Sequence, residues 1–490
     1  MNAEYSKLSG RAIPLYVDLD DTLIGTDILW EQIIRLAFQK PFLIPLMICV
    51  SFRGKALFKK WLSERVEVPV EHLPWSEVVV DHVRKHKDKG GSVILATATH
   101  RNIAFKINEH LGIFDAVLAT NGDTNLKGSS KAEAIAEYNA SLNERHYAYV
   151  GDSASDIPIW EKASEAWMVS RSHSLESQCR KAVPHLKVLE SRGIGYFSSW
   201  ITLLRIRQWS KNVLLFLPLL LAHKTTSPAV IISTSVAALS FCFAASGVYL
   251  FNDCSDVFKD RSHPLKKRRP LASGAIPLWR GVMASLILIV LAVSLALSSV
   301  GKGFALILLL YLFSNVLYTC WIKSVAILDV VLLSLFYSLR IFAGGVASNV
   351  EVSKWLLAFS LFFFLCLAFG KRYQEIFLLK SSEVTEHTRG YIPNDQSIIS
   401  ICGISAGFVS VMVLVLYVNS PEVLKLYRTP DLLLLLAPLG IYWIARFWML
   451  VARGLMHDDP VFFALKDRVS WGIGAAVLLL LSMAQFAWPG

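Results

Sequence analysis

From about Asn212 onward, apolar stretches close to membrane-spanning length follow one another, and no other feature constrains the fold as strongly. An α-helix needs about 20 apolar residues to cross the hydrocarbon core of a bilayer. Backbone polar groups inside a bilayer must be satisfied within the protein, so repeated stretches of this kind predict an all-α polytopic bundle. We expect about nine transmembrane helices, at 212–223, 229–251, 281–300, 303–321, 326–347, 354–370, 397–418, 431–450 and 470–488.

The residues before this region have a different composition, mixing charged and apolar residues as an ordinary cytosolic enzyme does. We expect three parts: a first domain over 1–190, a linker and interfacial segment over 191–211, and a membrane domain over 212–490. The seven cysteines are scattered without a CxxC pair, which favours reduced thiols. No signal peptide is expected, because the first short apolar run leads straight into a charged loop.

Basic residues are distributed unevenly among the loops between the expected spans. Loops of one parity carry most of them, including the run 266–269 (KKRR), whereas loops of the other parity carry few. By the positive-inside rule, we expect the basic loops, the N-terminal domain and the active sites on the cytoplasmic side of the inner membrane. This asymmetry also explains the net charge of +11, so the charge gives no support for a nucleic-acid partner.

Three aspartates follow the second apolar stretch at intervals of three and four residues: Asp253, Asp256 and Asp260, with Asn252 adjoining. On a helix this spacing places the carboxylates on one stripe. Carboxylates so close repel one another unless a cation lies between them, and Mg²⁺ suits a few carboxylates plus substrate phosphate oxygens. The competing interpretation is a solvated acidic helix end, but charges at the mouth of a span are usually functional.

The pattern NDxxDxxxD at 252–260 resembles the motif of the UbiA-type superfamily of intramembrane prenyltransferases. The resemblance covers about 205–490 and includes the segments 207–212 (RQWSKN) and 268–274 (RRPLASG). It implies a nine-helix bundle around a cavity, in which Asn252 and the three aspartates bind a diphosphate through Mg²⁺. We expect Arg268, next to Pro270, to bind a substrate phosphate, and Lys266 and Lys267 to anchor the loop on anionic lipid.

One departure from this superfamily points to a branch of it. Its prenyltransferases usually carry a second DxxxD motif, whereas here Leu333 stands where the aspartate after Asp329 is expected. A different set resembles the phosphoribosyltransferase branch, which includes decaprenyl-phosphate phosphoribosyltransferases: Tyr318, Lys323, Asp329 and Arg340. Ala326 stands where that branch has a proline. The resemblance implies phosphoribosyl diphosphate as the donor and a polyprenyl phosphate lipid as the acceptor.

The chemistry of such a transfer suits these residues. Loss of diphosphate from C1 of the ribose leaves an oxocarbenium-like centre, which an oxygen of the lipid phosphate attacks. Lys323 and Arg340 would add positive charge near the departing diphosphate. Two alternatives stay open: Arg340 as the structural partner of an acid such as Asp329, and Tyr318 with Asp329 as a buried polar pair.

Near the N-terminus, an apolar run over 12–17 leads directly into the motif DxDxT at Asp18, Asp20 and Thr22. Such a run is typical of a buried parallel strand that ends at a loop. The motif resembles that of haloacid dehalogenase (HAD) phosphatases, and the later motifs of that superfamily follow in order, at Thr97, Lys131, Asp152 and Asp156. The resemblance implies an α/β Rossmannoid domain with a helical cap.

The roles of these residues follow from the resemblance. Asp18 would attack phosphorus and Asp20 would serve as the general acid and base. Thr97 and Lys131 would hold the transferring phosphoryl group, with Thr99 and Lys127 as competing candidates. Asp18, Asp152 and Asp156 would bind Mg²⁺.

About seventy residues separate the first two HAD motifs, which is enough for a helical cap. Within them, 41–50 (PFLIPLMICV) is unusually apolar and is flanked by basic residues. It is too short and too interrupted by proline to span a bilayer. We favour an ordinary buried cap helix; the alternative is contact with the membrane surface.

The two halves together suggest phosphoribosyl transfer to a lipid phosphate followed by removal of the 5-phosphate. Two alternatives stay open. One is a prenyltransferase that uses a prenyl diphosphate and an aromatic or other acceptor; the other is a membrane-anchored phosphatase without transferase activity. The sequence leaves the polyprenyl length and the oligomeric state undetermined.

Overall fold

The computed structural model describes residues 12–121, 125–170, 172–191, 195–222, 227–264, 266–381, 390–421, 423, 427–456 and 460–485. The chain forms two compact units. The first comprises Met1–Ile206 and Tyr249–Leu286, and the second comprises Arg207–Val248 and Ile287–Gly490. The segment that carries the three aspartates thus belongs to the first unit, and the expected domain boundaries at 190 and 211 stay a prediction.

The first unit contains a six-stranded parallel sheet of order β3-β2-β1-β4-β5-β6. Its strands are β1 (Leu15–Val17), β2 (Val93–His100), β3 (Ala116–Thr120), β4 (Ala148–Gly151), β5 (Glu165–Ser170) and β6 (Lys187–Ser191). Val17 at the end of β1 pairs with Leu95 and Val150. The carboxyl ends of the three central strands therefore meet at one edge, where open α/β sheets bind ligands.

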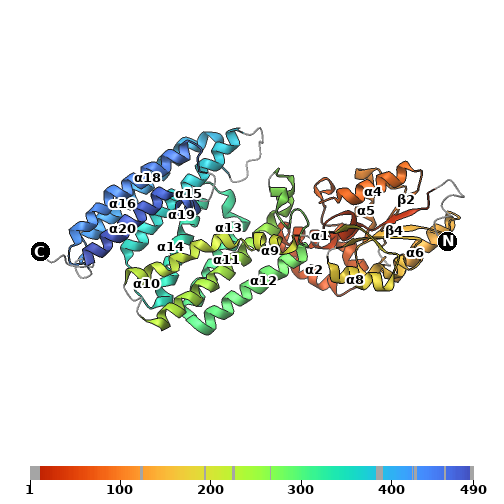
Figure 1. Ribbon diagram of the computed structural model, residues 1–490, viewed down its shortest axis with the longest axis horizontal. Helices are drawn as coiled ribbons and strands as arrows, with labels where there is room; N and C mark the ends of the chain where they lie inside the picture. Colours follow the sequence, from red (N-terminus) through yellow and green to blue (C-terminus); the bar gives the residue numbers. More distant parts are fainter. Residues whose placement is uncertain are drawn as a thin grey trace. The chain divides into compact units, whose positions relative to one another are not determined.

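Helices cover both faces of this sheet, which explains why the strand β1 and the first half of β2 are apolar. Figure 1 shows α4 and α5 on one side of the strands and α6 and α8 on the other. Leu15 and Val17 belong to the core under α4 and α5, whereas Tyr16 belongs to the core under α6 and α8. The helices are α4 (Glu77–Asp88), α5 (Arg101–Leu111), α6 (Ser129–Ser141), α7 (Ile157–Trp160), α8 (His173–Ala182) and α9 (Tyr196–Leu203).

The predicted helical cap is present between β1 and β2. It consists of α1 (Ile28–Gln39), α2 (Ile44–Ser51) and α3 (Lys55–Ser63). Asp27 caps α1, because its carboxylate accepts hydrogen bonds from the first backbone N–H groups of that helix. The cap has a small core of its own, formed by Leu36, Phe58, Leu62 and Val66.

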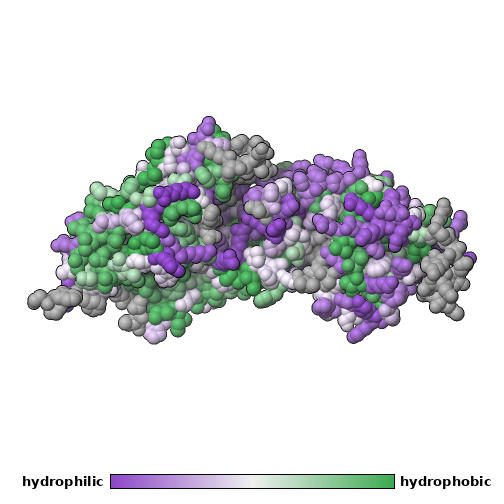
Figure 2. All heavy atoms as spheres, turned by 45° about the horizontal axis from the view of Figure 1, so that its top comes forward, coloured by the Kyte–Doolittle hydropathy of each residue, from purple (hydrophilic) through white to green (hydrophobic). Residues whose placement is uncertain are grey.

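Eight helices among the described residues are long and apolar enough to cross a membrane. They are based on α11 (Pro228–Ser262), α12 (Leu278–Leu295), α13 (Lys302–Cys320), α14 (Leu328–Ser348), α15 (Lys354–Ser381), α16 (Gln396–Val418), α18 (Leu436–Ala452) and α20 (Arg468–Gln485). In Figure 2, hydrophobic residues gather over the helical part at the left, as expected for an integral membrane protein. The predicted membrane bundle is therefore confirmed at the level of its long helices.

The first of the nine expected spans, at 212–223, differs from the prediction. It is a 3₁₀ segment at Ile206–Phe216 followed by the short helix α10 at Leu217–Leu221. Pro218 lies in the first turn of α10, where a residue without an N–H group is tolerated, so it starts a new helix instead of extending one. The segment packs closely on α14, because a Cβ atom at Gly344 would lie 2.0 Å from the backbone oxygen of Leu215.

The helix α11 is longer than a span requires. Its 35 residues extend over about 52 Å, against about 30 Å for the hydrocarbon core. Its N-terminal part belongs to the second unit and its C-terminal part, from Tyr249, belongs to the first. The aspartates at 253–260 therefore lie on the extension of a span, as the sequence predicts.

Candidate active sites

The nucleophile candidate of the HAD motif, Asp18, directly follows β1. Its carboxylate oxygen Oδ2 lies 2.8 Å from Nζ of Lys131, and both side chains are buried. The same ammonium group lies 3.8 Å from Oδ1 of Asp156 and donates to the hydroxyl of Tyr149 at 3.2 Å. Lys131 thus reaches the site predicted for it, while the competing Lys127 is exposed on the loop before α6.

Asp152 and Asp156 complete an acidic group with Asp18. One ligand oxygen from each lies within 4.8 Å of the others. Asp156 is held in place, because its Oδ2 accepts from the backbone N–H of Asp152 at 3.3 Å and from that of Ser153 at 3.2 Å. Three fixed carboxylates around one point match the donor set of a Mg²⁺ site that also takes phosphate oxygens.

Asp20, the predicted general acid and base, is positioned by two hydrogen bonds. Its Oδ1 accepts from the backbone N–H of Ile28 at 2.8 Å, and its Oδ2 accepts from the Thr99 hydroxyl at 2.8 Å. Burial raises the pKa of Asp20 to about 7, with a further contribution from the charge of Asp27. Burial also raises the pKa of Asp18 to about 6, opposed chiefly by Lys131. A carboxyl group with a pKa near 7 is suited to giving and taking a proton.

The two threonines at the end of β2 have different positions. Thr97 is fully buried and its hydroxyl oxygen accepts from the backbone N–H of Thr99 at 3.0 Å. Thr99 contacts Asp20, so the competing candidate supports the acid and base. The role of Thr97 toward a phosphoryl group stays a prediction.

Lys59 is a site residue that sequence reasoning missed. It comes from α3 of the cap, and its Nζ donates to the backbone oxygen of Ala98 at 2.6 Å and to Asn125 at 3.0 Å. Burial lowers the pKa of Lys59, and the charges of Asp20 and Asp27 oppose that shift. No motif marks this lysine among its neighbours, because only the folding of the cap brings it to the edge of the sheet.

The aspartates of α11 are surrounded by arginines. Asp253 accepts from Arg205 and, at 3.3 Å, from Arg269, which also donates to Asp260 at 2.7 Å. Asn252 donates to Asp256 at 3.1 Å. Arginine side chains therefore provide positive charge beside these carboxylates.

These contacts come from Arg205 and Arg269, whereas the side chain of Arg268 is exposed and its role toward a substrate phosphate stays a prediction. Within the described parts of the chain, the three ligand atoms of Asp253, Asp256 and Asp260 do not approach as closely as those around Asp18. Their donor chemistry suits Mg²⁺ with a bound diphosphate. A second metal site at these residues stays a prediction.

A buried network surrounds Asp329 at the start of α14. Its two carboxylate oxygens accept from Arg372 and from the hydroxyl of Tyr391, each at 2.6 Å. Arg372 also donates to the hydroxyl of Tyr318 at 3.2 Å. Arg372 thus links the partly buried Tyr318 to the buried Asp329, so these two residues belong to one polar network but do not form a direct pair. Lys323 lies nearby in the chain, in the 3₁₀ turn Ile322–Ser324.

Arg340 lies elsewhere in the second unit. Its guanidinium donates to Asn212 at 2.9 Å, to the hydroxyl of Tyr311 at 3.0 Å and to the backbone oxygen of Phe336 at 2.8 Å. The expected alternative partner Asp329 is engaged by Arg372 instead. These contacts account for a structural role that ties α13, α14 and the 3₁₀ segment together, and a role toward substrate stays a prediction.

A buried ion pair joins the cap to the end of α11 inside the first unit. The guanidinium of Arg261 donates to Glu31 of α1 at 2.7 and 3.1 Å and to the backbone oxygen of Ala272 at 3.0 Å. Beside it, a Cβ atom at Gly274 would lie 2.3 Å from the backbone oxygen of Gly25. Two backbones meet here, so within the first unit the end of α11 and the segment after it pack closely against the cap.

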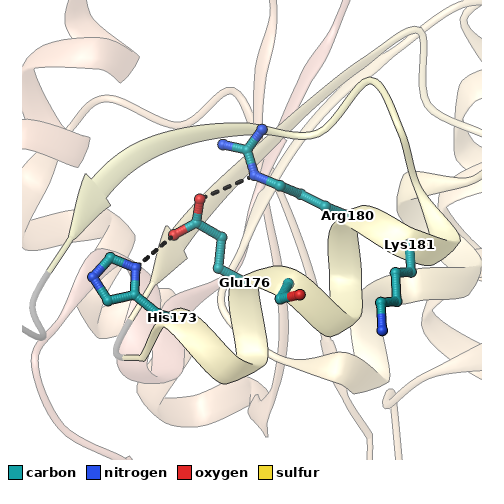
Figure 3. A pocket seen from close by; sticks show the side chains of 5 residues that line it. His173, Glu176, Arg180 and Lys181 are labelled. Carbon is teal, nitrogen blue, oxygen red and sulfur yellow. Dashed lines mark hydrogen bonds and ion pairs between the residues drawn. The ribbon is translucent and has the colours of Figure 1, made fainter.

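Figure 3 shows a pocket on α8 that has no relation to these sites. It is lined by His173, Glu176, Ser177, Arg180 and Lys181. Its side chains form an ordinary helical ion pair, in which Arg180 donates to Glu176 at 3.0 Å. None of the predicted catalytic or binding residues lines it.

Comparisons with known proteins agree with the two halves of this fold. The model of the UbiA prenyltransferase family matches residues 213–473, and that of haloacid dehalogenase-like hydrolases matches residues 15–161. An uncharacterized protein of Sinorhizobium fredii, y4nM, is 35% identical over 97% of this chain and 92% of its own length. The nodulation protein NoeC of Azorhizobium caulinodans is 32% identical over 59% of this chain and 92% of its own length.

A third relative carries an activity in its name. The decaprenyl-phosphate phosphoribosyltransferase of Corynebacterium glutamicum is 36% identical over 39% of this chain. The match spans 60% of that relative's length.

Proposed function

Since this chain belongs to the UbiA prenyltransferase family and carries a haloacid dehalogenase-like domain before it, we propose that it is a bifunctional membrane enzyme. In the first step it transfers 5-phosphoribosyl from phosphoribosyl diphosphate to a polyprenyl phosphate. In the second step its N-terminal domain removes the 5-phosphate from the lipid product.

The residues at and near Asp329 favour phosphoribosyl diphosphate over a prenyl diphosphate as the donor. A prenyl diphosphate site of this superfamily is expected to have a second acidic pair, yet Leu333 packs in the hydrophobic core at that position. Asp329 itself is buried and paired with Arg372 and Tyr391. A leucine at position 333 cannot supply the second carboxylate of such a pair, which favours a donor that needs one acidic cluster. The similarity to a phosphoribosyltransferase supports the same choice.

In the transfer step, a lipid phosphate oxygen forms a bond to C1 of the ribose while the bond from C1 to the diphosphate breaks. Asp253, Asp256 and Asp260 would hold Mg²⁺, which neutralises charge on the leaving diphosphate. Arg205 and Arg269 lie against the same carboxylates and are placed to bind its oxygens. The nucleophile is already anionic, so the step needs no strong base.

In the hydrolysis step, a carboxylate oxygen of Asp18 attacks the phosphorus of the 5-phosphate, and the bond to the ribose oxygen breaks. Asp20 gives its proton to that oxygen and then takes one from the water that hydrolyses the aspartyl phosphate. Lys131, 2.8 Å from Asp18, holds the phosphoryl oxygens. Asp18, Asp152 and Asp156 would bind Mg²⁺, which offsets the charge of the phosphoryl group.

The orientation of the chain belongs to the same proposal. The bias of basic residues supports a cytoplasmic location, at the inner membrane, for the N-terminal domain and the aspartates of α11. A soluble, highly charged donor then reaches the transfer site without crossing the bilayer.

A double-label experiment tests both steps at once. Purified protein with Mg²⁺ and a polyprenyl phosphate receives phosphoribosyl diphosphate labelled with ¹⁴C in the ribose and ³²P in the 5-phosphate. We expect the wild type to place ¹⁴C in extracted lipid and to release ³²P as inorganic phosphate. Asp18→Asn should leave both labels in the lipid, and Asp253→Asn should leave neither there. Asp81→Asn and Asp431→Asn, at exposed positions, serve as matched controls.

Each alternative predicts a different result. A prenyltransferase would leave the lipid unlabelled by this donor but would consume a prenyl diphosphate. A phosphatase that is merely anchored would hydrolyse phosphate monoesters while Asp253→Asn had no effect on any activity. Retention of equal ³²P in wild type and Asp18→Asn lipid would refute the second step alone.

A further inference from the structure

The cap helix α2 has an unusual surface for a helix of a folded domain. None of its eight residues is buried, although all but the last are apolar. The largest exposed side chains lie at its two ends, where Phe42 is 75% and Phe52 is 85% exposed. The prediction that favoured an ordinary buried cap helix is therefore wrong, and the alternative of contact with the membrane surface stays open.

One side of this segment is explained by the cap itself. Leu43, Met47 and Val50 recur at intervals of four and three residues and pack against the small core of the cap. The opposite side consists of Phe42, Leu46, Cys49 and Phe52, with Ile48 beside it, and all of these are exposed. A helix on a soluble domain normally has polar residues on this side. The helix is instead apolar on both sides.

The charged residues along this segment of the chain are all of one sign. No acidic residue occurs between Lys40 and Ser63, whereas Arg53, Lys55 and Lys60 are exposed there. An apolar face with a basic border matches the interface of an anionic bilayer, in which acyl chains take the apolar side chains and lipid phosphates take the cations. A protein partner would need both an apolar and an acidic surface.

The geometry suits a helix that lies in the interface. Eight residues extend over about 12 Å, far less than the hydrocarbon core. The chain bends by 116° between α1 and the segment Pro41–Ser51, so the apolar segment stands apart as a separate short element. We propose that α2 and its flanking residues Phe42 and Phe52 insert into the headgroup region of the bilayer and hold the hydrolase domain at the lipid surface.

The location of this contact gives it a consequence for catalysis, which rests on the proposed function. The same cap contributes Lys59 to the edge of the sheet beside Asp20. A cap held at the bilayer keeps that edge close to the level at which a phosphorylated sugar on a lipid is presented. We therefore expect the hydrolase domain to hydrolyse a lipid-linked phosphate ester faster than a soluble phosphate ester.

Cys49 permits a test in the intact chain, because its thiol lies on the exposed side of α2. In a Cys320→Ser/Cys402→Ser background, the four other thiols are buried, so a fluorescent maleimide labels Cys49. The protein is placed in nanodiscs with anionic lipid that carries nitroxides on its acyl chains. The control is the same background with Cys49→Ser and Ser177→Cys, which puts the label on the exposed surface of α8.

We expect the acyl-chain nitroxides to quench the label on Cys49 at least twofold and to leave the label on the control unchanged. Aqueous iodide should quench them in the opposite order. Iodide quenching of both labels alike would overturn the proposal. Crosslinking of Cys49 between two copies, in place of lipid quenching, would also overturn it by assigning the face to a second protein chain.

A second arm uses activity and separates this proposal from the proposed function. Leu46→Ser/Phe52→Ser should lower hydrolysis of the lipid-linked phosphate at least fivefold and leave hydrolysis of soluble p-nitrophenyl phosphate unchanged. Equal rates on the lipid substrate would overturn the catalytic consequence. If the wild type hydrolyses no lipid-linked phosphate, the proposed function fails, while the quenching result still decides the membrane contact.

Discussion

Removal of one charge from the Glu31–Arg261 pair should separate the cap helix α1 from the end of α11. The pair is almost completely buried, with side-chain exposures of 0% and 4%, and its two hydrogen bonds are 2.7 and 3.1 Å long. Glu31→Leu leaves the guanidinium of Arg261 in a dry site with one backbone acceptor. Loss of one partner of such a pair costs about 3–5 kcal/mol, because the remaining charge is uncompensated.

The double variant should be less destabilised than the sum of the two single variants. In Glu31→Leu/Arg261→Met no charge remains buried, and replacement of a buried ion pair by apolar residues is often close to neutral. We therefore expect a coupling energy of about 1–3 kcal/mol between the two positions. Glu176→Gln on α8 is the matched control, since its ion pair with Arg180 is surface-exposed and contributes about 0.5 kcal/mol or less.

Hydrogen exchange of the intact protein in nanodiscs measures these effects locally. A loss of about 3 kcal/mol should raise the exchange rate of the α1 amides about a hundredfold, if α1 opens as a unit. The control should change exchange only in α8. Unchanged exchange of α1 in Glu31→Leu, or strictly additive effects in the double variant, would refute the reasoning that this pair holds the two segments together.

Three further predictions concern single side chains. Asp20→Asn should lower hydrolysis of alkyl phosphates by about 10²–10⁴, with a much smaller effect on p-nitrophenyl phosphate, whose leaving group needs no proton; equal losses on both esters would contradict a general-acid role. Arg269→Ala should raise the KM for phosphoribosyl diphosphate in a steady-state assay. Arg268→Ala, which removes an exposed side chain, should change this KM little. A larger KM increase in Arg268→Ala than in Arg269→Ala would identify Arg268 as the ligand. Tyr391→Phe removes a buried hydrogen bond to Asp329 and should cost about 1–3 kcal/mol of stability, seen as a lower Tm in detergent; an unchanged Tm would show that the network tolerates its loss.

In the membrane half, hydropathy predicted the long helices correctly but did not predict where a helix is interrupted. Eight of the expected spans form long helices, because a run of apolar residues long enough for a bilayer has few other ways to satisfy its backbone. The segment 212–223 was predicted to be one span, but Pro218 within it starts a separate short helix. An apolar composition indicates that a segment is buried in lipid. Whether the segment is one continuous helix depends on its backbone hydrogen bonds, which a proline interrupts.

In the cap, the prediction overestimated how far an apolar segment is buried by protein. The apolar run at 41–50 was expected to be buried, and the structure exposes one whole side of it. A sequence states that a side chain avoids water, but it does not state whether protein or lipid replaces the water. That decision depends on what the rest of the domain leaves to cover it.

The candidate site residues could largely be predicted from the sequence alone. Motifs with fixed spacing, such as those around Asp18 and Asp253, place their side chains at strand ends or on one helical stripe, because local backbone geometry sets those positions. The partners of these residues depend on contacts between segments far apart in the chain. Lys59 beside Asp20, Arg269 between two aspartates and Arg372 on Asp329 were therefore decided only by the tertiary structure. A long, flexible cation carries no local signal of its partner, so only the packing of the whole chain determines which acid it neutralises.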